Sequence, residues 1–511
     1  MKQSLKTLVW LFCLLLLLIP SDSFSERLQP SNFVYQGAFR LPENYNWGAR
    51  GLSYYPPGNS GAGSLLVTGF EGLLDDSAYY GEVAIPEPRS EANWENLPMA
   101  VFLRQTTAFD GGLIKTTLNT DYVFVSGIQY VPPQGSQTDG KLYGSLNAWY
   151  PEGDFGDDSF QTIWFSSLNG SNARGLFFVG PSTAPYHGRK MGDYLFTVPQ
   201  WYADRYLGGR ILVTGRARGT PAGDSPELTT RGGSQGPTLF AFRPRQSDNP
   251  AGNSNLDAIP MLYYRVKYPG CAGPDIGLGG QPVDCDYPGF SMCDSWTGGG
   301  FVESGRKNAI LLLGHKGSTN CYYCGDPTDD SECHQTPAPG ECTPMCNESR
   351  GYHCGPYERQ VIFYDTDELG GATQGLSDPW SVLPYATWRP EPFYLGDAHG
   401  HACEDVGGMA VDSLGQRVFM VERGLGTENA AVVHVWQTQA AACPQCVGNP
   451  VFLEDVTFPS GTNCECVSGT AITIGSGVIV KHGAAVTFRA PIVKLKPGAK
   501  FEMGGQVVIK Q

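Results

Sequence analysis

Short apolar strands bounded by glycine recur along the chain. Five segments share one order: a small or polar residue, glycine, a short alternating strand, a turn, and four or five apolar residues that end near another glycine. Alternation with a period of two is typical of half-buried β-strands. The glycines that open these segments are Gly51, Gly112, Gly175, Gly300 and Gly408. The pattern predicts repeated β-sheet units.

The spacing of the repeat predicts the number of units. Successive glycines lie 61, 63, 125 and 108 residues apart. The gap of 125 leaves room for one further unit, built from strands between Tyr202 and Phe290. A cysteine-rich insertion at 317–358 accounts for most of the excess in the gap of 108. We therefore expect six units, within a range of five to seven.

A unit of three or four short antiparallel strands cannot bury both of its faces alone. Radial closure of such sheets buries them and protects most strand edges. The predicted fold class is therefore all-β, with a six-bladed β-propeller over residues 26–440. The last unit ends near Trp436 after three strands. We expect the isolated N-terminal strand from Phe33 to pair next to Val432–Trp436 and close the ring.

A different pattern begins at Ala471. Pairs of apolar residues at positions i and i+2 return every six to eight residues as far as Val507, with glycines at the turns. Short strands at this interval predict a small C-terminal β-solenoid over residues 467–511, whose strands stack on neighbouring coils. Residues 441–466 are then a cysteine-containing linker.

Residues 1–25 have the pattern of a secretory signal peptide. Lys2 and Lys6 precede an apolar run at Leu8–Ile19, and small residues follow at Ser23 and Ser25. The run is too short to cross a bilayer, and no later stretch is apolar enough to be a transmembrane segment. We therefore expect an exported protein that is secreted or held at the cell surface.

Cysteine content supports an oxidising compartment. Cys13 lies in the signal segment, which leaves an even number of the 15 cysteines in the mature chain. Disulfides are the expected state after export. Six cysteines crowd into 321–354, and four more are Cys443, Cys446, Cys464 and Cys466. The second group also has zinc-ribbon-like spacing, so zinc is the alternative to two disulfides there.

Charge limits the partners. The formal net charge is −15, so nucleic acid is not expected to bind. The last 45 residues are instead basic, because they contain six lysines or arginines and one acidic residue, Glu502. Such a basic tail suits docking on the acidic propeller or on an anionic cell surface, and a merely solvated face is the alternative.

Two segments resemble known families. The sequence VGGMAVDSLGQRVFMVERG, from Val406, resembles blades of NHL-type and gluconolactonase-like propellers, in which a Gly-Leu-Ala-Val-Asp strand precedes a turn and an Arg-Val-Tyr-Val-like strand. The tail looks like the three-coathanger-type β-solenoid stacks of some bacterial secreted proteins. The first resemblance implies a propeller, and its calcium-dependent hydrolases hold the metal with carboxylates and an Asn. That ligand set has no residue-by-residue match here, so calcium is one cofactor to test and none is required.

Candidate site residues follow from the predicted ring. In a propeller, the loops that enter the innermost strands and those that follow the second strands open on one face around the channel. The entering positions hold Trp47, Arg50, Asp110, Arg174, Asp294, Trp296, His401, Glu404 and Asp405. The positions after the second strands hold Glu71, His315 and Glu422. His401 is the candidate metal ligand, and the others are candidates for ligand binding.

These residue types suit carbohydrate recognition. An indole stacks on the C–H face of a sugar while Asp and Arg hydrogen-bond its hydroxyl groups. No nucleophile, base and orienting residue stand at a recognisable spacing. The predicted function is therefore an exported binding protein for a glycan or another surface polymer. The alternatives are a calcium-assisted hydrolase or lyase that uses channel carboxylates, and an interaction platform in which these side chains only pair with one another.

Overall fold

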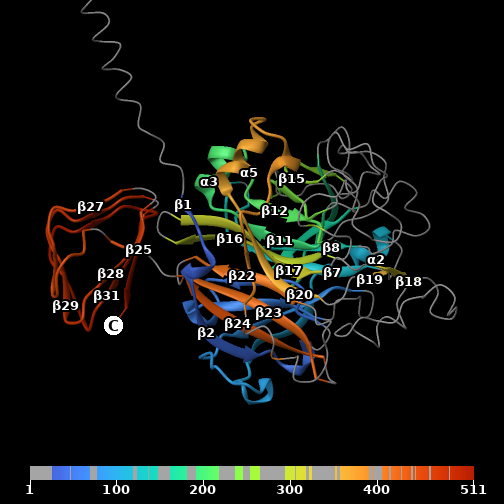
Figure 1. Cartoon of the computed structure of the whole chain (residues 1–511), viewed down its shortest axis with the longest axis horizontal. Helices are drawn as coiled ribbons and strands as arrows, with labels where there is room; N and C mark the ends of the chain where they lie inside the picture. Colours follow the sequence, from blue (N-terminus) through green and yellow to red (C-terminus); the bar gives the residue numbers. More distant parts are fainter. Residues whose placement is uncertain are drawn as a thin grey trace, which may run out of the picture.

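The computed structural model describes residues 26–510 except 46–47, 70–76, 119–122, 136, 148–160, 181–190, 218–235, 245–253, 265–289, 291–293, 305–306, 318–321, 325–350, 354–356, 391–394, 396–405, 414–415, 427–428, 439–440, 444, 460–461 and 483. The predicted signal segment thus lies outside the described residues. Figure 1 shows the larger unit of sheets from the side, with a smaller C-terminal unit at its left. Among the described helices, none is long and apolar enough to span a membrane.

Five of the sheets formed by the described strands are arranged as the blades of a propeller. The first sheet consists of β3 (Leu52–Tyr55), β4 (Ser64–Thr68), β5 (Tyr79–Ala84) and β6 (Phe102–Ala108). The second consists of β7 (Phe124–Val131), β8 (Lys141–Asn147), β9 (Ile163–Ser167) and β10 (Arg174–Val179), with β14 (Asn255–Leu256) added in parallel. The third consists of β11 (Tyr194–Thr197), β12 (Leu212–Gly215), β13 (Leu239–Phe242) and β15 (Ala258–Leu262).

The fourth and fifth sheets include the strands nearest the N-terminus. The fourth consists of β16 (Ser295–Ser304), β17 (Lys307–Lys316), β20 (Glu358–Tyr364) and β21 (Ala386–Trp388), with the short β1 (Glu26–Arg27) beside β17. The fifth consists of β22 (Val406–Asp412), β23 (Arg417–Leu425), β24 (Ala430–Thr438) and β2 (Phe33–Arg40). The α-helices are α2 (Leu113–Leu118), α3 (Gln200–Tyr206) and α5 (Thr366–Thr373). Short 3-10 turns are η1 (Pro30–Asn32), η2 (Glu43–Tyr45), η3 (Asn59–Gly61), η4 (Trp94–Asn96) and η6 (Pro379–Ser381).

Glycines let the five innermost strands meet at the axis. Contacts run from β3 to β7, β11, β16, β22 and back to β3, so they close a ring. A Cβ on Gly127 of β7 would lie 2.9 Å from the backbone nitrogen of Leu195 in β11. A Cβ on Gly408 of β22 would lie 2.6 Å from the backbone nitrogen of Leu52 in β3. The glycine-marked pattern therefore reflects strands too close together for a side chain.

The N-terminal strand closes the ring as expected. β2 pairs antiparallel with β24, with Phe33 opposite Thr438 and Arg40 opposite Val432. Figure 1 shows β2 in blue beside the orange β24, so the two ends of the propeller sequence share one sheet. β2 thus supplies the fourth strand of the fifth sheet, and its pairing with β24 closes the ring.

The preferred count of six units is corrected to five for the described residues. The strands between Tyr202 and Phe290 that had suggested an extra unit are β12 and β13 of the third sheet. The segment after Gly175 is β10, an outermost strand, and the segment after Gly112 is helix α2. Inner and outer strands of antiparallel sheets share the same alternation, so periodicity alone could not distinguish them.

The cysteine-rich insertion separates two adjacent strands of the fourth sheet, β17 and β20. Its described parts include β18 (Tyr322–Cys324) and β19 (Gly351–His353), which pair with each other antiparallel. Figure 1 shows β18 and β19 on the side of the ring away from the C-terminal unit. The insertion therefore extends one connection without breaking the order of the strands.

Three parallel sheets make up the C-terminal unit. They consist of β25 (Ala441–Ala442), β28 (Asn463–Val467), β31 (Ala485–Arg489) and β34 (Gln506–Lys510); β26 (Val451–Leu453), β29 (Ala471–Ile474) and β32 (Ile492–Leu495); and β27 (Thr457–Phe458), β30 (Ile479–Val480) and β33 (Lys500–Phe501). Ile472 pairs with Val451 on one side and with Val493 on the other. The expected linker at 441–466 is therefore corrected, because parallel pairing already begins at Ala441.

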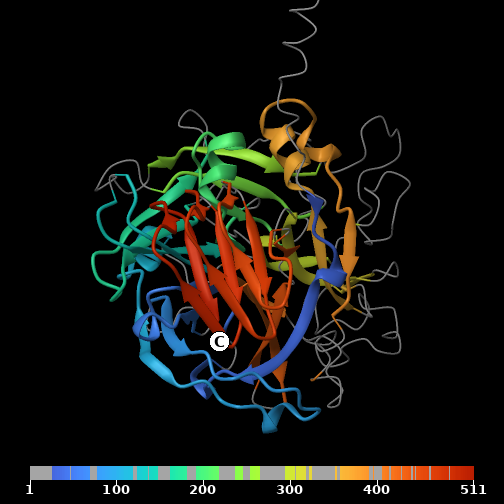
Figure 2. The same cartoon turned by 90° about the vertical axis from the view of Figure 1, so that its left-hand side faces the viewer.

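The C-terminal unit lies over one face of the ring. In Figure 2 its red strands stand in front of the propeller. Contacts between β28 and β16 join the two parts. Its interior is apolar, since Ile472, Ile474, Val480 and Phe488 are fully buried. This unit therefore has a core of its own.

Candidate functional site at the propeller mouth

The mouth is defined here by the starts of the innermost strands and the ends of the second strands. In the third sheet, Asp193 directly precedes β11 and Arg216 directly follows β12. In the fourth sheet, Asp294 directly precedes β16 and Lys316 ends β17. Two successive blades thus place an acid and a base at equivalent positions.

A buried polar group joins the second and third blades. The carboxylate of Asp193 accepts a hydrogen bond from the backbone N–H of Ala217 at 2.6 Å, and Arg216 Nε lies 3.5 Å from its Oδ2. The side-chain amide of Asn147, at the end of β8, donates to Asp193 and accepts from the Arg216 guanidinium. All three side chains are buried. The charges of Asp193 and Arg216 therefore compensate each other within the third blade, and Asn147 joins this pair to the second blade.

The fourth blade repeats the arrangement with a lysine. Lys316 Nζ lies 2.9 and 2.8 Å from the two carboxylate oxygens of Asp294. The backbone N–H of Gly317 donates to the same carboxylate at 2.9 Å. Asp294 is buried, so this ion pair lies partly away from water. The neighbouring His315 ring lies 4.9 Å from the ring of Tyr357.

In the fifth blade, Glu422 belongs to a buried polar chain. Its Oε2 lies 2.9 Å from Nε2 of His434, whose Nδ1 lies 3.0 Å from the hydroxyl of Tyr35. Arg359 of the fourth blade places Nη1 4.0 Å from Oε1 of Glu422. Burial and the charge of Glu422 raise the pKa of Tyr35, so its hydroxyl stays protonated. In the tautomer that carries its proton on Nε2, His434 accepts from Tyr35 and donates to Glu422.

Two further candidate residues lie near the mouth, and both contact other parts of the protein. Asp110 lies between β6 and α2, so its expected place before an innermost strand is wrong. Its carboxylate accepts from the backbone N–H of Ala78 at 2.9 Å and of Ile114 at 3.3 Å. Burial raises the pKa of Asp110, and these backbone hydrogen bonds oppose the rise. The guanidinium of Arg50 lies over the ring of Phe124, 5.6 Å from its centre.

Other candidates lie elsewhere or outside the described residues. Arg174 is at the start of the outermost strand β10 and is exposed, so its expected place before an innermost strand is wrong. Trp296 is 1% exposed and packs in the main apolar core. The remaining candidates fall outside the described residues: Trp47, Glu71, His401, Glu404 and Asp405.

Sequence reasoning missed several mouth residues. Residues of four kinds were missed at strand ends or on neighbouring strands: Asn147, Arg216, Arg359 and His434. The contacts Asn147–Arg216 and Arg359–Glu422 cross between blades, whereas His434 meets Glu422 within the fifth blade. One signal was available: Asp193 stands before an apolar strand, as Asp294 does in the next unit. The misplaced third unit hid this correspondence.

A separate polar contact lies at the opposite ends of the innermost strands. The indole N–H of Trp201, on α3, donates to Glu303 near the end of β16 at 2.9 Å. Trp201 is 42% exposed, and behind it lie the rings of Tyr202 and Phe301. Burial raises the pKa of Glu303 to about 7, and the indole hydrogen bond opposes the rise. An exposed indole beside a carboxyl group is thus available away from the mouth.

The described mouth carboxylates are held by donors. Asp193 and Asp294 each pair with a cation and accept a backbone N–H, while Glu422 meets His434 and Arg359. Such contacts hold the side chains in fixed positions. The geometry is that of a rigid polar rim between blades.

Comparisons with known proteins do not assign a function, so the interpretation of the site rests on its geometry. A scan against protein-family models finds no matching family, and a search of curated proteins finds no match. The resemblance of the segment from Val406 to NHL-type blades therefore rests on its own residues, which form β22 and β23.

Proposed function

We propose that this propeller is an exported binding protein that recognises a glycan or another surface polymer. The observation that favours binding over catalysis is the engagement of the mouth carboxylates Asp193, Asp294 and Glu422 by cations, histidine or backbone N–H groups. A general acid or base must exchange protons with a substrate. Carboxylates fixed in ion pairs are better suited to holding a rigid rim than to that chemistry.

Export and surface attachment are parts of the same proposal. The signal-like segment at 1–25 and the two disulfides of the C-terminal unit support an oxidising location. The three parallel sheets support the interpretation of that unit as a β-solenoid. Its exposed lysines, Lys494, Lys496 and Lys500, suit contact with an anionic surface.

A glycan array with the full-length mature protein tests the proposal. We expect binding to one class of glycan, with no turnover of the bound sugar. Arg50→Ala at the mouth and Trp201→Ala on the other side locate the site, since only the variant at the true site loses binding. Calcium-dependent melting is measured in parallel. Absence of glycan binding together with an unchanged melting temperature would contradict the proposal, and release of shortened glycans would favour a hydrolase or lyase.

A further inference from the structure

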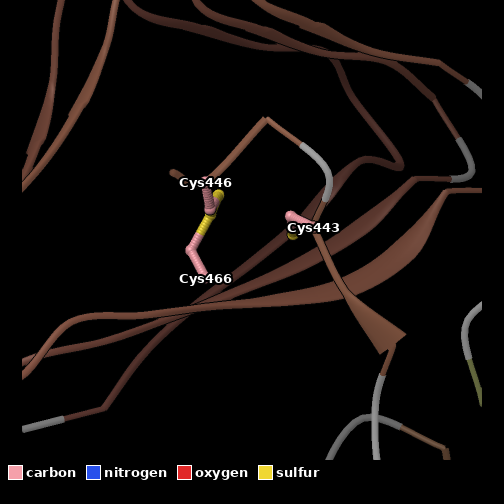
Figure 3. Close-up of side chains that lie close together, drawn as sticks. All are labelled: Cys443, Cys446 and Cys466. Atoms are coloured by element: carbon pink, nitrogen blue, oxygen red, sulfur yellow. A yellow bond between two sulfur atoms is a disulfide. The ribbon is translucent and has the colours of Figure 1, made fainter. Parts of the chain in front are cut away.

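Four cysteines form one group where the ring joins the C-terminal unit. Cys443 and Cys446 follow β25, whereas Cys464 and Cys466 lie two positions apart on β28 and therefore point to the same side of the strand. Disulfides join Cys443 to Cys464 and Cys446 to Cys466. Figure 3 shows Cys443 beside the Cys446–Cys466 disulfide. Two short segments are thus tied together twice at one place.

The sulfur atoms are gathered within the reach of a single ion. The Sγ atoms of Cys443, Cys446 and Cys466 all lie within 4.8 Å of one another, and that of Cys464 is bonded to Cys443. A Zn²⁺ ion held by four thiolates at about 2.3 Å keeps the sulfurs roughly 3.8 Å apart. Three of the four sulfurs thus lie about as close together as the ligands of a tetrahedral thiolate site, and the fourth is bonded to one of these three.

The surroundings suit a structural metal. Cys443, Cys464 and Cys466 are 2%, 4% and 0% exposed, and they share an apolar cluster with Val486 and Phe488. An ion among these sulfurs would be shielded from water.

We propose that these four cysteines bind one Zn²⁺ ion when their disulfides are reduced. Two molecules of a dithiol, each oxidised to its disulfide, deliver four electrons and four protons to the two protein disulfides and leave four cysteine thiols. Zn²⁺ then forms four Zn–S bonds and releases four protons. The zinc ion would join the same two segments in the reduced protein that the disulfides join in the oxidised protein. A chain that binds zinc before it is oxidised would therefore already have these segments held together.

Metal titration of the reduced full-length protein tests this inference, with Co²⁺ as a coloured substitute for Zn²⁺. We expect the visible bands and thiolate charge-transfer absorption of tetrahedral Co²⁺, and their loss on adding Zn²⁺. Cys446→Ser/Cys466→Ser should bind one equivalent less than the wild type. Cys324→Ser/Cys333→Ser, in the insertion, is the matched control and should retain the signal of the four-cysteine group.

The comparison remains decisive if a variant folds poorly. Cys446→Ser/Cys466→Ser keeps the Cys443–Cys464 disulfide under oxidising conditions, so its fold is checked by melting before reduction. Cys443→Ser/Cys464→Ser provides the complementary pair. Equal metal content and equal Co²⁺ spectra in the wild type and both of these variants would overturn the proposal, whatever the glycan array shows.

Discussion

The hydroxyl of Tyr35 lies 3.0 Å from Nδ1 of His434, which is 399 positions later in the chain. Tyr35 belongs to the closing strand β2, and His434 passes the contact on to Glu422 at 2.9 Å. The strand that closes the ring therefore also holds a buried carboxylate at the mouth. The pairing that closes the ring therefore also positions a side chain of the candidate site.

Removing the hydroxyl of Tyr35 should weaken the fold. Tyr35→Phe leaves Nδ1 of His434 without that partner, and an unsatisfied buried polar atom costs about 1–3 kcal/mol. Urea unfolding measures the change in the free energy of unfolding. Tyr79→Phe is the control, since Tyr79 makes no side-chain hydrogen bond in the described part of the chain, and its effect should stay within about 0.5 kcal/mol. Equal effects of the two substitutions would speak against the polar chain.

The space around two glycines predicts opposite effects of an alanine substitution on stability. A Cβ at Gly127 would meet Leu195 Cβ at 2.8 Å, so Gly127→Ala should destabilise the protein by about 1–3 kcal/mol. Gly371, in α5, has only ordinary contacts at 3.8 Å, so Gly371→Ala should stabilise it by about 0.5–1 kcal/mol. Thermal melting compares the two. A tolerant Gly127 would contradict the packing of β7 against β11.

Glu303 should make stability depend on pH. Its pKa is raised by burial to about 7, whereas an unfolded glutamate ionises near about 4.3. Between these values the folded chain retains a proton that the unfolded chain has lost. Stability should therefore fall as pH rises through this window, by up to ~1.4 kcal/mol per pH unit.

The substitution Glu303→Gln isolates this effect. The amide oxygen still accepts from Trp201 but carries no charge, so the contribution to the slope should vanish and the variant should gain stability at about pH 8. Urea unfolding from about pH 5 to about pH 8 measures the slope. Glu91→Gln, at an exposed position, should leave it unchanged. A Glu303→Gln slope that matches the wild type would show that this carboxyl does not carry the dependence.

Two incomplete elements in the sequence made it possible to predict the closed ring. The last unit lacked a fourth strand and Phe33–Arg40 lacked a sheet, so pairing β2 with β24 satisfied both. Gly300 and Gly408 marked innermost strands correctly. Gly175 lies in an outer strand, which alternates like an inner one, and Gly112 precedes helix α2, so neither marked an innermost strand and the predicted count of units was wrong.

The candidate site was predictable only within one blade. Asp294 and Glu422 could be placed at the mouth, because each stands beside an innermost or a second strand of its own unit. Their setting also depends on contacts between blades, such as Arg359 with Glu422. The angle and distance between neighbouring sheets determine these contacts, and spacing along the chain does not encode them.

Cross-linking β2 to β24 tests the closed five-bladed ring most directly. Val34 and Gln437 face each other across the two strands, so Val34→Cys/Gln437→Cys should form a disulfide, detected by mass spectrometry of non-reduced peptides. Val34→Cys/Thr438→Cys is offset by one residue, which points the second side chain to the other face, and should cross-link far less. Efficient cross-linking of the first pair alone is the predicted result. Failure of that pair, or equal yields from both, would contradict closure of the ring by the N-terminal strand.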